Sequence, residues 1–336
     1  MSHRERQSFD VLLAGAGPAG IAAAMHFRQA GLTVMHVEEG ELAQTIRRFP
    51  AGVRLFSTRE NLALPGFPFG PDPDSSPTRE EYIVYLEESV TAAGLRVETE
   101  TVAVATGTTP ERYRIDGIGS DGTRRTVEAR NVVVASGGYF FPNILGIPGE
   151  DQSHVHHYFQ NDVVSREGRF LVVGGRNSAV EAAVNIAEAG ASALLVYRKS
   201  RLPRSKIKPW LLPRLDAQLR AGRIRIRYRS VPREITPEGV LLSEANGSAS
   251  IEPVETVFLL TGYGPDYRLL RELEVRFHKQ TARPLFTQAT LETRTPGVFV
   301  CGTVALQRYR EQVTIENSRD HALDMLGSIR TRCDAG

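Results

Sequence analysis

The chain has 336 residues, of which 41% are apolar and 24% are charged; these fractions are typical of a globular protein and exclude disordered, collagen-like and coiled-coil chains. The formal net charge of +2 gives no overall field that would draw the chain to nucleic acid or to a membrane surface. Only two cysteines occur, Cys301 and Cys333, so a disulfide framework and a cysteine-rich metal site are also excluded.

The first elements along the chain predict a βαβ unit. Residues 10–14 form a short apolar run that indicates a buried strand, and a glycine-rich stretch follows at 15–20. A helix is expected over 21–30, where Gly31 ends it, and a second strand is expected at 32–37. The order of strand, glycine loop, helix and strand is that of a dinucleotide-binding fold.

The glycine loop has the spacing GxGxxG. Gly15 permits a tight turn, Gly17 lets the backbone approach a pyrophosphate, and Gly20 lets the helix pack closely on the sheet. The pyrophosphate then lies at a helix N-terminus, where free N–H groups favour anions. Glu38 follows Gly20 by 18 residues (38 − 20), about where a carboxylate binds the ribose diol of an adenosine.

The middle of the chain is less regular before the same pattern restarts. Residues 40–77 are rich in glycine and proline, and a helix capped by Thr78 is expected over 78–93. Short alternating segments over 96–131 indicate a small β-meander. Further strands are expected at 132–137, 170–173, 194–197, 257–260 and 298–302, helices at 180–189, 211–221 and 314–330, and a β region over 224–255.

A second glycine loop, at 174–179, predicts a second nucleotide site with a different preference. Arg176 and Ala179 stand at its middle and last glycine positions, and 18 residues after Ala179 (197 − 179) the chain has Tyr197 instead of an acid. A basic cluster follows this tyrosine: Arg198, Lys199 and Arg201. Because a carboxylate repels a ribose 2′-phosphate whereas arginine and lysine bind one, the first site is predicted to bind FAD and the second NADPH.

The cysteines limit the route of the electrons. FAD and NADPH in one chain imply hydride transfer from nicotinamide to flavin, since these cofactors carry the chemistry. Neither cysteine belongs to a CxxC or CxxxxC pair, and dithiol exchange needs an attacking and a resolving thiol. Cys301 is predicted to be buried in an apolar strand, and Cys333 to lie in a mobile tail. The reduced flavin is therefore expected to act directly on a bound substrate, a partner or oxygen.

The motifs resemble those of the thioredoxin-reductase-like flavoproteins over nearly the whole chain. The loop at 15–20 is similar to the FAD loop of that superfamily, the loop at 174–179 to its NADPH loop, and residues 295–302 to the strand that returns to the FAD domain. Two departures are Arg176, in place of a glycine, and Thr303, where the superfamily usually has an aspartate.

This resemblance implies an α/β fold with two Rossmann-type, three-layer ββα dinucleotide-binding domains, like that of thioredoxin reductase. The FAD-binding domain would be split between residues 1–150 and 265–336. The NADPH-binding domain would be inserted between these parts, at residues 151–264.

A closer resemblance is to the bacillithiol disulfide reductases, FAD-dependent and NADPH-oxidising proteins that lack a redox dithiol. The block at 207–213, which contains Lys-Pro-Trp, is the most specific of the shared motifs, and residues 157–159 and 262–267 also match. Well-studied members carry a cysteine, proposed as the thiol that meets the substrate, at the position of Ala19. A mechanism that uses that thiol is therefore closed to this chain.

The loops and the resemblance together predict the residues of both sites. The expected FAD contacts are Gly15, Gly17, Pro18, Ala19, Gly20, Glu38, Glu39, Phe56, Ser57, Asn61, Val102, Ala135, Ser136, Gly137, Gly302, Thr303, Thr314 and Ile315. The expected NADPH contacts are Gly175, Arg176, Asn177, Ser178, Ala179, Tyr197, Arg198, Lys199, Arg201 and Gly262. Tyr82 is the side chain expected to face a substrate, and no metal site is expected although His154, His156 and His157 lie close in sequence.

The resemblance implies NADPH-dependent reduction of a low-molecular-weight thiol disulfide or of a small redox protein. Three alternatives stay open: a ferredoxin– or flavodoxin–NADP reductase, a flavin monooxygenase, and a non-catalytic, nucleotide-binding redox sensor. A homo-oligomer without nucleic-acid or membrane partners is expected. Because the sequence has neither an apolar run long enough to cross a bilayer nor a secretory signal, the predicted location is the cytoplasm.

Overall fold

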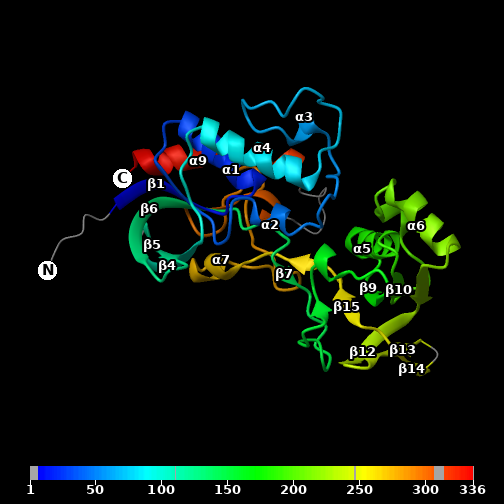
Figure 1. Cartoon of the computed structure of the whole chain (residues 1–336). Coiled ribbons are helices and arrows are strands. Elements are labelled where there is room, and N and C mark those ends of the chain that lie inside the picture. Colours follow the sequence, from blue (N-terminus) through cyan, green and yellow to red (C-terminus); the bar gives the residue numbers. More distant parts are fainter. Residues whose placement is uncertain (1–6, 110, 246, 306–313, 336) are drawn as a thin grey trace. The chain divides into compact units, whose positions relative to one another are not determined.

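The computed structural model describes residues 7–109, 111–245, 247–305 and 314–335. The chain folds into two compact units (Figure 1). Unit 1 comprises Met1–Arg48, Gly52–Phe140 and Pro265–Gly336, and unit 2 comprises Phe49–Ala51 and Phe141–Gly264. No helix within the described ranges is both long and apolar enough to cross a membrane.

Unit 1 is built on a sheet with the strand order β3-β2-β1-β6-β5-β4, in which β17 also pairs with β6. β1 pairs in parallel with β2 and β6, whereas β4, β5 and β6 form an antiparallel meander. The strands are β1 (Gln7–Ala14), β2 (Val34–Val37), β3 (Val97–Glu98), β4 (Thr101–Thr108), β5 (Tyr113–Gly119), β6 (Arg124–Val134) and β17 (Val298–Val300).

One long strand, β6, joins the meander to the parallel part of the sheet. Its first half pairs antiparallel with β5, and its second half, from Val132 to Val134, pairs in parallel with β17. The sequence predicted two elements here, because the alternating pattern gives way to a continuous apolar run at residue 132. That change of pattern marks a change in burial along a single strand, since strands covered on both faces lose the alternation.

The sheet of unit 1 is covered on both faces. On one face, Val11 and Leu13 of β1 pack with Phe27 of α1; on the other, Leu12 of β1 packs with Ile115 of the meander. The alternation of side chains along β1 accounts for both contacts. The helices of this unit are α1 (Pro18–Gln29), α2 (Gln44–Arg47), α3 (Arg59–Leu62), α4 (Arg79–Ala92), α7 (Arg268–Glu272), α8 (Ile315–Ser318) and α9 (His321–Asp334), with a 3₁₀ turn η3 (Gly302–Ala305).

Two helices of unit 1 compare directly with the sequence predictions. Thr78 caps α4 as predicted, in a capping box with Glu81. The single helix expected over 314–330 is wrong, because the chain forms α8 and α9 with a break between them. The Ser318 hydroxyl donates to the carbonyl oxygens of Thr314 (2.6 Å) and Ile315 (3.3 Å), and such bonds compete with the helical ladder.

Unit 2 has a parallel sheet with the strand order β11-β10-β9-β15-β8. Two helices, α5 and α6, pack on one face, and the antiparallel sheet β12-β13-β14 packs on the other. The bounds are β8 (Val155–His156), β9 (Arg169–Val173), β10 (Ser192–Tyr197), β11 (Ile224–Tyr228), β12 (Ser230–Thr236), β13 (Gly239–Glu244), β14 (Ala249–Glu252), β15 (Thr256–Leu259), α5 (Asn177–Glu188), α6 (Leu211–Arg220), and the 3₁₀ turns η1 (Asn161–Val163) and η2 (Arg204–Lys206).

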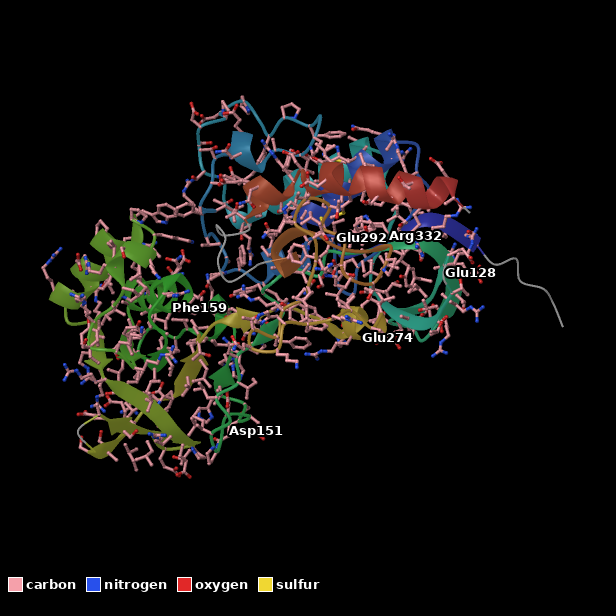
Figure 2. The ribbon with its side chains drawn as sticks, turned by 180° about the vertical axis from the view of Figure 1, so that it is seen from behind. Glu128, Asp151, Phe159, Glu274, Glu292 and Arg332 are labelled. Carbon is pink, nitrogen blue, oxygen red and sulfur yellow. The ribbon has the colours of Figure 1, made fainter. Side chains whose placement is uncertain are left out.

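Alternating side chains of β9 divide between the two cores of unit 2. Val172 packs with Val180 of α5, and Leu171 packs with Val240 of β13. Phe159, labelled in Figure 2, lies against Phe258 with a ring-centroid distance of 5.1 Å. The first and last strands of the segment Phe141–Gly264 pair with each other in a separate two-stranded ribbon. These strands are β7 (Phe141–Pro142) and β16 (Tyr263–Gly264). Both units therefore have the three-layer α/β architecture that the sequence predicted.

Two candidate nucleotide-binding sites

The first glycine loop connects β1 to α1 with almost no room for side chains. Gly15 has a φ of 114°, and a Cβ there would lie 2.4 Å from the carbonyl oxygen of Ala135. A Cβ at Gly20 would lie 2.0 Å from the oxygen of Gly15. At Gly17, by contrast, a Cβ would meet nothing within 4 Å. The first turn of α1 is therefore open at the residue that was predicted to face a pyrophosphate.

The start of α1 lies beside the segment that follows β17. Pro18 occupies the first helical position, where its missing N–H costs nothing. A Cβ on Gly302 would come within 2.8 Å of the Cβ of Ala19, and the Oγ1 of Thr303 lies 3.8 Å from the Cβ position of Gly137. Residues predicted from three distant segments are thus close together at this end of the sheet.

Glu38 is held by the loop that it faces. Its Oε2 accepts a hydrogen bond from the N–H of Ala16 (2.6 Å), and its Oε1 accepts one from Gly40 (3.1 Å). Burial raises the pKa of this carboxyl, although the two bonds act in the opposite direction. Each oxygen keeps a second lone pair with which to accept a ribose hydroxyl. The N–H of Thr101 donates to the Glu38 carbonyl (2.8 Å), which brings the start of β4, with Val102, alongside.

Glu39 is paired with a cation that the sequence analysis did not single out. Arg268 donates from Nη2 to Glu39 Oε2 at 2.6 Å and also binds both carboxylate oxygens of Asp266. The carbonyl of Asp266 accepts from the Ser136 hydroxyl (2.8 Å). The predicted FAD contacts Glu39 and Ser136 are therefore engaged within the protein. No local signal could have identified Arg268, because it lies far from Glu39 along the chain.

His36 is a second site residue that sequence reasoning missed. It is 3% exposed, and its Nε2 lies 3.0 Å from the carbonyl oxygen of Gly15. Burial lowers its pKa to about 4, so the ring is neutral near pH 7 and its Nε2–H donates to Gly15. A lone histidine in an apolar strand gives no sequence signal of this role.

The segment before α3 carries a buried hydroxyl without a protein partner. Ser57 is 8% exposed, and no described residue hydrogen-bonds its Oγ. The neighbouring Thr58 hydroxyl is used, because it caps α3 by accepting from the N–H of Asn61 (3.4 Å). Phe56 is 70% exposed. Buried hydroxyl groups in folded proteins nearly always have a hydrogen-bond partner. A bound ligand would provide that partner for the Ser57 hydroxyl.

Two predicted contacts of unit 1, the start of α8 and Tyr82, are less suited to bind a ligand than the sequence indicated. Thr314 and Ile315 begin α8, which is one turn of four residues and not the start of a long helix; its dipole is correspondingly small. Tyr82 is completely buried, and its hydroxyl donates to the carbonyl oxygen of Leu62 (3.3 Å). Burial also raises the pKa of Tyr82 well above its usual value. Tyr82 has no exposed surface with which to meet a substrate.

The second glycine loop, between β9 and α5, is closed on one side by an aromatic ring. Gly174 has a φ of 146°, and a Cβ there would lie 2.5 Å from the Leu260 carbonyl oxygen and 2.7 Å from the Cβ of Ala179. A Cβ at Gly175 would lie 2.3 Å from the ring of Tyr197. Arg176 has extended backbone angles that any residue adopts, so it replaces the middle glycine without strain.

The basic cluster after β10 is exposed and carries no ion pair within the described part of the chain. Its members are Arg198, Lys199 and Arg201. The next cation, Arg204, differs because it forms a two-pronged pair with Asp216 (2.9 and 2.7 Å). The charges of this cluster are therefore available to bind an anion such as a ribose 2′-phosphate.

The Lys-Pro-Trp block is tied to the first turns of α5. The Asn177 Oδ1 accepts a hydrogen bond from the N–H of Lys208 (2.8 Å), and the Lys208 ammonium pairs with Glu181 at 3.2 Å. The side chains of this pair are only 13% and 10% exposed. Lys208 is thus a largely enclosed anchor of this loop, and not an exposed contact for a phosphate or an acidic substrate. Ser178 lies in the same first turn of α5.

Gly262 lies beside the two-stranded ribbon of unit 2. Its carbonyl oxygen accepts from the N–H of Asn143 (3.0 Å), and it has a φ of 107°. The three neighbouring histidines do not converge: His157 lies 3.8 Å from Glu150, while His156 packs on Phe258. Across the described residues, no group of histidine, cysteine and acidic side chains is arranged to hold a metal ion.

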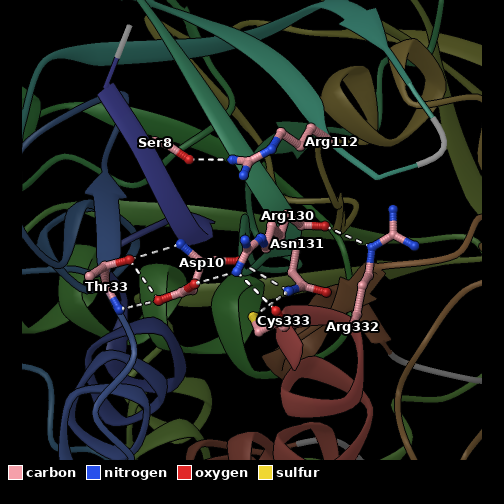
Figure 3. A network of polar contacts seen from close by, with 8 residues as sticks. All are labelled: Ser8, Asp10, Thr33, Arg112, Arg130, Asn131, Arg332 and Cys333. Carbon is pink, nitrogen blue, oxygen red and sulfur yellow. Dashed lines mark hydrogen bonds and ion pairs between the residues drawn. The ribbon is translucent and has the colours of Figure 1, made fainter. Parts of the chain in front are cut away.

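Both cysteines are restrained. Cys301 is fully buried, and burial raises its pKa to about 12. Cys333 belongs to α9, so the prediction of a mobile tail is wrong (Figure 3). Its Sγ accepts from Asn131 Nδ2 (3.6 Å) and its carbonyl oxygen from Arg130 (3.0 Å), while burial raises its pKa too. Neither thiol is prepared for exchange, because exchange needs an accessible thiolate.

The geometry of both sites fits the predicted cofactors. Around the first loop, the open first turn of α1, the carboxylate of Glu38 and the unpartnered hydroxyl of Ser57 suit an unphosphorylated adenosine and a flavin. Around the second, Tyr197 replaces the carboxylate and the basic cluster follows it, which suits a phosphorylated ribose.

Comparisons with known proteins agree with this geometry. Residues 12–302 match the family described as pyridine nucleotide-disulphide oxidoreductase. The bacilliredoxin reductase Bdr of Bacillus subtilis is 31% identical over 96% of this chain and 97% of its own length. The structure of the bacillithiol disulfide reductase Bdr (YpdA) from Bacillus cereus matches with a TM-score of 0.91 and 29% identity, over 97% of this chain and 100% of that one.

The fold is shared more widely. Thioredoxin reductase from T. acidophilum matches with a TM-score of 0.76 at 17% identity, over 98% of this chain and 99% of that one. The resemblance stated from the motifs is thereby confirmed. The chain belongs to the pyridine nucleotide-disulphide oxidoreductase family, which makes it an oxidoreductase and implies FAD and NADPH as its cofactors.

Proposed function

We propose that this protein is an NADPH-dependent flavoprotein that reduces a low-molecular-weight thiol disulfide without a dithiol of its own. The similar proteins named as bacilliredoxin and bacillithiol disulfide reductases support this substrate class. The bound cofactors would supply the redox chemistry, in which NADPH and a proton convert one disulfide into two thiols by way of the flavin.

The residues around the first loop would hold FAD. The N–H groups at the start of α1, next to Gly17, would bind the pyrophosphate, and Glu38 would bind the ribose hydroxyls. Ser57 and Asn61 would donate to the flavin; Asn61 is exposed, and Ser57 has the buried unpartnered hydroxyl. Gly302 and Thr303 would approach it from the end of β17. His36 would keep Gly15 in place by donating to its carbonyl oxygen.

The residues around the second loop would hold NADPH. The first turn of α5, from Asn177 to Ala179, would bind the pyrophosphate beside Arg176. The exposed basic cluster would bind the 2′-phosphate, and Tyr197 would cover the loop through its contact with Gly175. The ion pair between Lys208 and Glu181 would hold the loop at 202–210 against α5 and so support this site.

The state of the two cysteines is the observation that carries the proposal. A dithiol reductase needs an accessible pair, whereas Cys301 is fully buried with a pKa raised to about 12, and Cys333 of α9 is partly buried with its Sγ against Asn131 of β6. Position 19, next to the start of α1, is an alanine. Electrons are therefore expected to leave for the acceptor without passing through a protein sulfur.

An acceptor screen tests the proposal. The purified protein, loaded with FAD, is mixed with NADPH and with oxidised low-molecular-weight thiols, among them bacillithiol disulfide, and NADPH oxidation is followed at one NADPH per disulfide reduced. Ferredoxin, flavodoxin and oxygen alone serve as the competing acceptors. Rapid reduction of ferredoxin or flavodoxin, with no turnover on any disulfide, would overturn the substrate class while leaving the cofactors in place.

We also propose a cytoplasmic location and a homo-oligomeric state. A reducing compartment suits a chain with two unpaired cysteines. The oligomer is tested by measuring the mass of the protein in solution by light scattering: a mass near 37.0 kDa would mean a monomer and would contradict that prediction.

A further inference from the structure

The short helix α3 has little intrinsic stability. It has four residues, Arg59–Leu62, and one isolated turn does not repay the cost of helix nucleation. Its end also leaves backbone carbonyls without helical partners. Yet this turn carries Asn61 and directly follows Ser57, two residues that the proposed function assigns to the flavin. Something outside α3 must therefore hold it.

Two side chains from other elements take the carbonyls at the end of α3. Arg319 donates from Nη1 to the carbonyl oxygens of Glu60 (3.1 Å), Asn61 (3.2 Å) and Ala63 (3.3 Å). Tyr82 of α4 donates to the remaining one, that of Leu62 (3.3 Å). The two hydrogens of the Arg319 Nη1 are shared among three carbonyls, of which that of Glu60 also accepts from the N–H of Ala63 (3.2 Å). A cation is well placed there, because hydrogen bonds from a charged donor to carbonyl oxygens are stronger than those from a neutral donor.

Arg319 also lies at the end of α8, whose N-cap Thr314 and first residue Ile315 are predicted FAD contacts. It is the C-cap residue of α8, which begins after Thr314, and the turn is closed by the bonds from Ser318 to Thr314 and Ile315. One guanidinium therefore joins α8 to α3, although some 250 residues separate them in sequence (319 − 60 = 259).

We propose that Arg319 is a positioning residue for FAD: it fixes the 57–61 segment, with the buried hydroxyl of Ser57, at a set place beside the start of α8. In this arrangement Arg319 acts through the protein carbonyls to which its Nη1 donates, and its Nε lies 3.9 Å from Oδ2 of Asp320. The proposal rests on the assignment of the first site to FAD. Tyr82, which has no exposed surface, also supports α3, through its hydrogen bond to the Leu62 carbonyl.

The test compares three variants as apoproteins titrated with FAD. Arg319→Met removes the donors, and Arg319→Lys keeps the charge but cannot reproduce the planar fork. Arg330→Met is the matched control, since Arg330 is an exposed arginine of α9 that donates to one carbonyl at the end of α1, that of Ala30 (3.3 Å). FAD dissociation constants are measured by flavin fluorescence, and the visible circular dichroism of bound flavin reports its surroundings.

We expect Arg319→Met to weaken FAD binding by about tenfold or more, since the charge-assisted hydrogen bonds that hold α3 in place are lost. Arg319→Lys should lie between it and the natural protein, and Arg330→Met should bind within about twofold of the natural protein. The flavin dichroism should change in both Arg319 variants and not in the control.

Each result decides something. If Arg319→Met folds and binds FAD as the natural protein does, with unchanged dichroism, the positioning role is wrong while the FAD assignment stands. If Arg319→Met does not fold, the same comparison is made with Arg319→Lys: unchanged FAD binding and dichroism in that variant would mean that the positioning role is wrong. If the natural apoprotein takes up no FAD at all, the proposed function itself fails.

Discussion

The charge that follows β10 is predicted to decide which nicotinamide nucleotide unit 2 prefers. Tyr197 leaves no carboxylate to repel a 2′-phosphate, and Arg198 and Lys199 are exposed beside it. Replacing both cations by alanine should raise the KM for NADPH about tenfold or more, because charge-assisted bonds to the phosphate are lost. The KM for NADH should change little. Steady-state kinetics with both nucleotides measure the effect.

The control for this prediction is Arg166→Ala, which removes an exposed cation of the same unit that precedes β9. It should leave both KM values unchanged. Equal increases for NADPH and NADH in the double variant would show that the cluster acts on something other than the 2′-phosphate.

His36 makes the stability of the protein depend on pH. Its pKa is about 4 in the folded chain because of burial, against 6.5 when unperturbed. The unfolded chain therefore binds more protons between these values, and the free energy of unfolding falls as the pH drops below about 6.5. The loss attributable to His36 should reach about 2 kcal/mol at pH 5 and about 3 kcal/mol below pH 4.

Denaturant unfolding at a series of pH values tests this prediction against His36→Gln. Glutamine keeps a donor for the Gly15 carbonyl but does not titrate, so the variant should lose stability less steeply between pH 6.5 and 4. His26, His156 and His321 also have lowered pKa values, but they are present in both proteins. Parallel pH profiles would mean that His36 is not protonated on unfolding.

At the scale of elements, the ion pair between Lys208 and Glu181, whose side chains are 13% and 10% exposed, joins the loop before α6 to α5. Removing one partner leaves a charge buried without compensation, which costs about 3–5 kcal/mol in comparable cases. Lys208→Met should therefore lower the thermal unfolding midpoint markedly. The double variant Lys208→Met/Glu181→Leu should recover much of the loss, because no lone charge remains.

The matched comparison is the pair between Arg214 of α6 and Glu188 of α5. Both side chains are 39% exposed, so Arg214→Met should cost about 0–1 kcal/mol. If the single variants at Lys208 and Arg214 shift the unfolding midpoint equally, burial does not distinguish the two pairs and the anchor role of Lys208 is wrong.

At the scale of the whole molecule, no protein sulfur is expected to take part in electron transfer. The double variant Cys301→Ala/Cys333→Ala should keep its bound FAD and most of its turnover with NADPH and the accepted disulfide. Cys301→Ala should cost some stability, because a buried atom is removed from a packed core. Turnover per bound FAD, with the flavin content measured by absorbance, separates the two effects.

A loss of turnover of a hundredfold or more in a double variant that still binds FAD would contradict this prediction. The single variants would then show which thiol is responsible. Cys333→Ala is the more informative of the two, because Cys333 is only partly buried and its removal disturbs the packing less.

The sequence by itself determined the two nucleotide loops, their difference in charge and the lack of a dithiol. These features are local: Gly15, Gly17 and Gly20 stand in one turn, and the basic cluster follows Tyr197 directly. The spacing of residues along the chain is enough to identify these features, since each depends on residues that a single turn or strand end brings together.

Only the tertiary structure decided which polar groups remain available. Arg319 reaches α3, Arg268 pairs with Glu39, and the thiol of Cys333 accepts a hydrogen bond from Asn131. It also removed Tyr82 from the substrate-facing residues and paired Lys208 with Glu181. Contacts between residues more than 200 positions apart, or between a side chain and a backbone carbonyl, leave no periodic pattern in the sequence, because they depend on how the layers pack and not on the local order of residues.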